Sequence, residues 1–261
     1  NVEMDCDDEW TKFGLSVNLS KLSLETSELD LDVKNLSFRQ DSTSLFVGDI
    51  KLRASTNSSG SSATLTSSFA DVGFDSDGDF ASFVKSLSQK DYSNVRAQMS
   101  VVFKETEPLC KVFLPELYLS RNTAFAYEYS SNELGRSFLY SDLVAWGDTY
   151  VKDLTLRTTV DTSDILTVNI MADMIRSGGL DFKSPDIGVE ILSDTAWSFR
   201  GRLNESAFHL GEKRWNLKSD FVSIRKKLIQ IDSLVLFNSD HSIVVDGTLG
   251  EGNKDIDGDG I

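Results

Sequence analysis

The chain has 261 residues, enough for one large domain or two ordinary ones with a buried core. Its 26 basic and 41 acidic residues give a net charge of −15, which repels phosphate backbones and excludes nucleic acid as the main partner. A hydrophobic content of 40% excludes a disordered acidic tail.

The N-terminal fifth of the chain alternates apolar with small or polar residues. The apolar members of its first two runs are Phe13, Leu15, Val17 and Leu19, followed by Leu29, Leu31 and Val33. A period of two places such residues on one face of a β-sheet and the polar residues on the other. These runs therefore predict strands that are apolar on one face only.

The alternation stops in two places before residue 92. The Ser-rich stretch at 57–62 predicts a mobile loop. Phe80, Phe83, Val84 and Leu87 follow at helical spacing and predict a short amphipathic helix near residues 79–89. This helix would close one end of the sheet or divide the chain into two sheet segments near 75–92.

The same alternation returns towards the C-terminus. Turns are predicted at Gly178-Gly179, at 184–186 and at 238–240, where Gly, Pro, Asn, Asp and Ser gather. The apolar members of the later runs include Ile187, Val189 and Ile191, then Trp215 and Leu217, then Ile243 and Val245. No long helices alternate with these strands, so a parallel α/β fold is not expected. We predict an all-β fold: an elongated, curved, mostly antiparallel sheet of many short strands.

Catalytic motifs are missing from the sequence. It contains no Gly-x-Ser-x-Gly nucleophile elbow and no Gly-rich nucleotide-binding pattern. Its two histidines leave little room for a catalytic triad. We therefore expect a protein that is not an enzyme and needs no cofactor. The two cysteines, Cys6 and Cys110, either form a disulfide or remain separate thiols, and the sequence leaves both alternatives open.

An Asp-rich motif near the C-terminus is the one local pattern with a chemical mechanism. Asp255, Asp257 and Asp259 repeat at the spacing of the first half of a calcium loop, with Gly260 at the sixth position. The bidentate acid that completes such a loop is missing from the sequence. Calcium binding at these three residues and simple solvated turns both remain open.

The segment 195–250 resembles a known family. It contains a strand around Trp197, an apolar run at 228–236, and a turn leading to the sequence Ser-Ile-Val-Val-Asp-Gly at 242–247. This pattern is similar to the large periplasmic part of the AsmA-like family of Gram-negative bacteria, which includes the translocation and assembly module proteins. The alternating texture of residues 13–54 resembles other parts of the same family.

The resemblance implies a taco-shaped β-sheet with an apolar groove, in proteins that support phospholipid transport and outer-membrane biogenesis. It implies a periplasmic location, an inner-membrane anchor in a segment absent here, and an outer-membrane barrel partner outside this chain. Residues 1–261 would then be an internal fragment of a longer protein.

The expected function is that of a lipid conduit, with phospholipid acyl chains as the partner. The expected groove residues are Phe13, Leu15, Val17, Leu19, Leu29, Leu31, Val33, Ile187, Val189, Ile191, Trp215, Leu217, Ile243 and Val245. The competing expectation is a closed β-sandwich on the cell surface that serves binding or adhesion, with calcium at the Asp-rich turn as a stabiliser.

Overall fold

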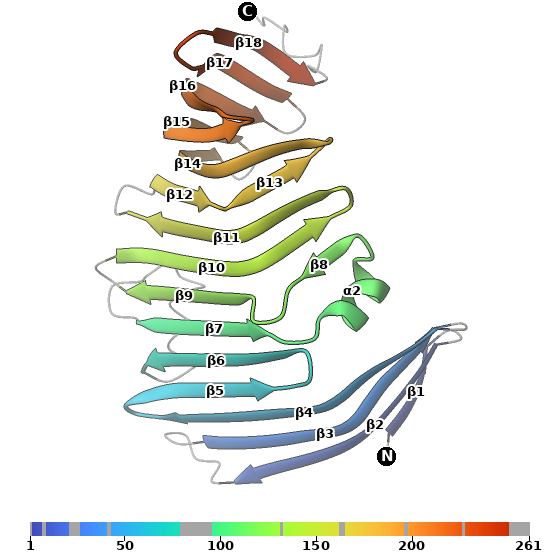
Figure 1. Ribbon diagram of the computed structural model, residues 1–261. Helices are drawn as coiled ribbons and strands as arrows, with labels where there is room; N and C mark the ends of the chain where they lie inside the picture. The colour runs from blue at the N-terminus through green and yellow to red at the C-terminus, as the bar shows by residue number, and fades with distance from the viewer. Residues whose placement is uncertain are drawn as a thin grey trace, which may run out of the picture.

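The described strands belong to a single 18-stranded β-sheet (Figure 1). The computed structural model describes residues 2–6, 9–20, 27–40, 43–78, 96–130, 133–161, 165–195, 198–225 and 228–250. The strands are β1 (Val2–Cys6), β2 (Glu9–Ser20), β3 (Ser27–Gln40), β4 (Thr43–Asn57), β5 (Gly60–Thr66), β6 (Ala70–Asp77), β7 (Ala97–Phe103), β8 (Leu117–Leu119), β9 (Ala124–Ser130), β10 (Glu133–Trp146), β11 (Thr149–Val160), β12 (Ile165–Met171), β13 (Met174–Ser177), β14 (Leu180–Thr195), β15 (Ser198–Leu210), β16 (Lys213–Arg225), β17 (Leu228–Phe237) and β18 (Ser242–Gly250).

The strands follow one another as an antiparallel meander. Most of them pair with the strand before and the strand after them in the chain. In the middle, β7 pairs with β9, while the short β8 pairs with the far end of β10. Both β12 and β13 lie between β11 and β14. The result is a long ladder with β2 near one end and β18 at the other (Figure 1), which confirms the predicted all-β, antiparallel, elongated fold.

The helix of the described chain is α2 (Glu107–Phe113), which the sequence reading missed. Pro108 in its first turn and an ion pair of 2.7 Å between Glu107 and Lys111 are the local signals that favour it. The helix predicted near 79–89 lies outside the described residues. Across that gap β6 and β7 pair directly, and a division of the chain near 75–92 stays a prediction. None of the described helices is long and apolar enough to span a membrane.

Many strands are longer than the sequence reading expected, because residues interpreted as turns lie inside them. The 184–186 segment belongs to the 16-residue strand β14, where Ser184 adopts a φ of 47°. The 57–62 stretch, predicted to be a mobile loop, contains the end of β4, a tight turn at Ser58-Ser59 and the start of β5. There the Asn57 side chain accepts hydrogen bonds from the backbone N–H groups of Ser59 and Gly60 at 2.7 and 3.2 Å. The turns at Gly178-Gly179 and at 238–240 are confirmed.

The mid-strand bends line up from strand to strand. Positive φ angles occur within the strands at Asn35, Gly48, Asp153, Ser184 and Ser233, and Figure 1 shows the bends in β4, β10 and β11. Backbone hydrogen bonds link neighbouring bends: the Asp173 N–H donates to the Lys152 carbonyl at 3.0 Å, and the Ser184 N–H donates to the Asp173 carbonyl at 2.7 Å. We call this row of bends the fold line. Left-handed backbone at Asn, Asp, Ser or Gly redirects a strand without ending it.

Burial is low for a chain of this size. The accessible surface is 17,663 Å², against about 11,400 Å² for a compact monomer of the same mass. The buried hydrophobic residues of the described chain are Val47, Ala70, Ala97, Tyr129 and Phe208. An extended sheet in one layer accounts for this, because both of its faces remain accessible.

Candidate functional site

One face of the sheet carries an unbroken row of apolar residues across ten strands, from β3 to β14. Each member is the direct register partner of the next, so all of them point to the same side of the sheet. The row consists of Leu31, Leu52, Leu65, Val72, Val101, Phe125, Leu139, Leu156, Ile170 and Ile187. At about 4.8 Å per strand it extends for about 43 Å. We call it the apolar row, and no titratable side chain interrupts it.

The side chains of the apolar row are all partly exposed, and none of them is buried. The described strands form one sheet rather than two packed sheets. The closed sandwich of the competing expectation stays a prediction, as does the open groove. An uncovered apolar strip of this length is a feature that soluble monomers rarely keep without a use.

A second row lies on the same face, two residues along each strand from the apolar row. Its side chains change from apolar to hydroxyl-bearing in the middle. It passes through Phe74, Met99 and Tyr127 and then reaches Ser137 and Thr158, whose hydroxyl groups are 2.7 Å apart. Beyond them it becomes apolar again: Thr158 pairs with Val168, and Val168 pairs with Val189. The apolar face thus has a patch of hydroxyl groups beside the unbroken row, at β9 to β11.

The predicted groove residues of the N-terminal runs fall on paired positions. Leu29, Leu31 and Val33 lie on β3 and are partly exposed. Their register partners on β2 are, in the same order, Leu19, Val17 and Leu15. These β2 residues and Phe13 are placed by their backbone alone, because their side chains lie outside the described ones. The register therefore joins the two predicted runs on one face.

The predicted residues of the C-terminal runs continue this face. Ile187, Val189 and Ile191 lie on β14 and are partly exposed. Leu217 pairs with Leu236, which pairs with Ile243 on β18.

Along the C-terminal strands of this face, the side chains become more exposed towards β18. Trp215 is partly exposed, with its ring 6.4 Å from that of His241. Ile243 and Val245 are 49% and 43% exposed, because β18 is the last described strand of the ladder. Among the described lining side chains, those of Ile243 and Val245 are therefore the most accessible.

The sequence reading missed the middle of the apolar face, since it named no groove residue between Val33 and Ile187. Eight members of the apolar row lie in that interval, from Leu52 to Ile170. The signal was present: residues such as Leu52, Leu65 and Leu156 alternate with polar neighbours as clearly as the runs that were chosen. Only the register shows that these separate runs form one line.

The potential metal ligands among the described residues do not form a cluster. No group of three or more His, Cys, Asp or Glu side chains that could hold a metal ion occurs among them. The proposed calcium ligands Asp255, Asp257 and Asp259 lie outside the described residues, so that prediction stays a prediction. Cys110 on α2 is a free cysteine, which leaves the separate thiol as the state seen for that residue.

The best-connected carboxylate lies on the opposite, polar face. Glu128 accepts hydrogen bonds from Arg136 Nε and Nη2 at 3.0 and 2.8 Å and from Gln98 at 3.4 Å, and it forms an ion pair with Arg96 at 3.3 Å. The Arg136 guanidinium is the main reason that the pKa of Glu128 lies below its ordinary value of 4.5. This carboxylate is consequently held ionised in a fixed orientation.

In comparisons with known proteins, no family model, no curated protein and no solved structure matches this chain. The fold and the site therefore define a class by their geometry alone: a long, bent, single-layer antiparallel sheet with one apolar and one polar face.

Proposed function

We propose that the chain is a structural lipid-conduit segment, in which the apolar face holds the acyl chains of phospholipids. The observation that carries this proposal is the apolar row, ten register partners that are all partly exposed and that no second described sheet covers. A sheet with one apolar face must either cover that face or use it.

The energetics suit transient binding. Burying an acyl chain gains about 0.8 kcal/mol per CH₂ group, so a chain of about 16 carbons gains on the order of 10 kcal/mol if it is fully enclosed. The apolar row repeats similar side chains at every strand and offers few places where an alkyl chain binds more tightly than elsewhere. Such a surface favours movement of the lipid along the row over permanent retention.

The cellular setting in this proposal rests on the resemblance to the AsmA-like family. It comprises the periplasm, an inner-membrane anchor outside this chain, an outer-membrane barrel as partner, and a role in outer-membrane biogenesis. The chain would then be one stretch of a longer bridge along which lipids pass.

A matched pair of variants on β14 tests the lipid-binding part of the proposal. Val189→Asp puts a charge on the apolar face, while Leu192→Asp puts the same charge on the polar face of the same strand, at a residue that is 42% exposed. Mass spectrometry of the lipids that co-purify with each folded protein is the measurement. We expect Val189→Asp to reduce bound phospholipid about tenfold or more, and Leu192→Asp to bind as the unchanged chain does.

Two results would contradict the proposal. One is that the unchanged chain co-purifies with no lipid. The other is that Val189→Asp unfolds the protein while Leu192→Asp does not, because this would mean that the apolar face is part of a closed core. Circular dichroism and thermal melting of both variants separate loss of lipid binding from loss of the fold.

A further inference from the structure

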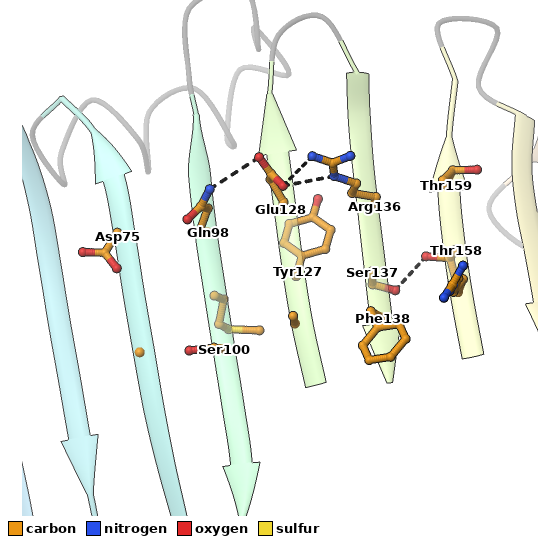
Figure 2. A pocket seen from close by; sticks show the side chains of 14 residues that line it. Asp75, Gln98, Ser100, Tyr127, Glu128, Arg136, Ser137, Phe138, Thr158 and Thr159 are labelled. Atoms are coloured by element: carbon orange, nitrogen blue, oxygen red, sulfur yellow. Dashed lines mark hydrogen bonds and ion pairs between the residues drawn. The ribbon is translucent and has the colours of Figure 1, made fainter. Parts of the chain in front are cut away.

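The polar face of the sheet contains a hollow of about 530 Å³ over β6, β7, β9, β10 and β11 (Figure 2). Its floor follows a second line of direct register partners: Gly73, Ser100, Ala126, Phe138 and Arg157. Each of these residues is the chain neighbour of a member of the apolar row. Ten of its lining residues alternate in this way and lie on the polar face, while Met99, Tyr127, Ser137 and Thr158 border the hollow from positions that alternate to the apolar face. The floor of the hollow thus faces away from the apolar row.

The hollow exists because side chains are small over three adjacent strands. Gly73, Ser100 and Ala126 leave the sheet almost bare over about 10 Å across the strands. The larger side chain of Phe138, which is 36% exposed, bounds the hollow on the next strand. The Arg157 guanidinium lies 5.7 Å from the centre of the Phe138 ring. This contact holds the arginine and the ring together at one end of the hollow.

Planar polar groups line one side of the floor. Gln98, Glu128 and Arg136 are register partners on β7, β9 and β10, and Figure 2 shows them joined by hydrogen bonds. Arg136 Nε and Nη2 both donate to Glu128 Oε2, at 3.0 and 2.8 Å, which fixes both groups in position. The Gln98 amide, the Glu128 carboxylate and the Arg136 guanidinium are thus held together in one hydrogen-bonded network along this side.

The charges that line the hollow balance. Asp75 and Glu128 supply two negative charges, and Arg136 and Arg157 supply two positive charges. In a chain with a net charge of −15, this is a locally neutral surface. A strongly charged ligand therefore gains little from it, whereas a neutral ligand with many hydroxyl groups can pair with acids and arginines alike.

We propose that this hollow binds a neutral oligosaccharide of two or three sugar units. The apolar C–H face of a sugar packs on an aromatic ring, here Phe138, and its adjacent hydroxyl groups hydrogen-bond to planar side chains, here Gln98 and Arg157. The volume is within the range of about 300–1,000 Å³ that is usual for small-molecule sites.

The test is a titration of the isotope-labelled chain, followed by amide NMR, with maltotriose, cellotriose and chitotriose. Saturable shifts of amides in β7, β9 and β10 with at least one of these neutral probes are expected. Ala126→Leu, which fills the floor, should weaken that binding at least tenfold. Ala124→Leu adds the same side chain two residues away on the same face of β9, outside the hollow, and should leave binding unchanged.

Phe138→Ala and Arg157→Ala remove side chains from the hollow and keep the test decisive if Ala126→Leu does not fold. Each should weaken binding about tenfold. The proposal is overturned if none of the three neutral probes shows binding at a probe concentration of about 10 mM, which detects even weak complexes. It is also overturned if Phe138→Ala and Arg157→Ala bind as tightly as the unchanged chain, or if charged tri-galacturonate binds more tightly than every neutral probe.

Discussion

The two faces of the central strands are made from alternating residues of the same segments, yet they differ completely in chemistry. On one face Val101, Phe125 and Leu139 continue the apolar row. On the other face their neighbours Ser100, Ala126 and Phe138 form the floor of a hollow with charged sides. Neither face is covered by another described sheet. One layer of strands can thus present two separate binding surfaces, because a strand directs successive side chains to opposite sides.

Beside the fold line, where Ser141 of β10 pairs with Leu154 next to Asp153, the deepest burial of the described chain involves hydroxyl groups. Ser141 is 0% and Thr123 is 1% exposed, and their hydroxyl oxygens are 2.7 Å apart. In most proteins serine and threonine are largely exposed and large apolar residues are buried. Here the bends interrupt the ladder of backbone hydrogen bonds, and small hydroxyl side chains supply partners at the close approach.

The largest expected effect is on the free energy of unfolding, and it differs between a buried residue and a partly exposed one. Phe208 is 8% exposed and packs edge-on against Phe182 at 5.2 Å, so Phe208→Ala should lower the free energy of unfolding by about 3 kcal/mol. Leu139→Ala in the apolar row should cost only about 1 kcal/mol, because its side chain is already partly in water. Urea denaturation measures both. A loss of about 3 kcal/mol or more for Leu139→Ala would mean that the apolar row is covered.

The next expected effect concerns the buried hydroxyl groups beside the fold line. Ser141 Oγ lies 3.0 Å from Ser120 Oγ and donates to the Leu143 carbonyl at 3.1 Å, in addition to its contact with Thr123. Ser141→Ala should therefore lower the free energy of unfolding by about 2 kcal/mol. Ser100→Ala, an exposed serine on the polar face, is the control and should change stability by less than about 0.5 kcal/mol. Equal losses of stability in the two variants would contradict the idea that the buried hydroxyl groups beside the fold line stabilise the protein.

The polar face can be probed through the titration of Glu128. Arg136→Gln should raise the pKa of Glu128 towards 4.5, because the main cause of its lowering is removed. A folded-state pKa below the unfolded value means that Glu128 stabilises the protein above about pH 4.5, and that this contribution is lost as the pH falls through the folded value. Carboxyl NMR titration is the measurement, and an unchanged pKa in Arg136→Gln would contradict this assignment.

The smallest expected effect tests the bends themselves. Ser184 has a φ of 47°, a conformation that glycine adopts more easily, so Ser184→Gly should raise the free energy of unfolding by about 0.5 kcal/mol. Thr64→Gly, at an exposed position of β5 without such a φ, should lower it by about 1 kcal/mol. Thermal melting measures whether the two variants change stability in opposite directions. A loss of stability in Ser184→Gly would show that the Ser184 side chain itself stabilises the protein.

Much of the architecture follows from local sequence. The alternation of Leu29, Leu31 and Val33 predicted a strand with one apolar face, and β3 is such a strand. The same reasoning misplaced the 184–186 segment, since residues that favour turns also permit a bend within a strand. It missed the hollow entirely, because Gly73, Ala126 and Phe138 are far apart in the chain and have no shared local pattern.

The sequence by itself determined which residues can share a face, because side-chain alternation depends only on the geometry of a single strand. Tertiary structure decided which strands are neighbours and in what register, and therefore that ten separate apolar residues join into one row. It also decided that no second described sheet lies over this row and that the bends align. Those properties depend on pairing between distant segments, which the local order of residues does not specify.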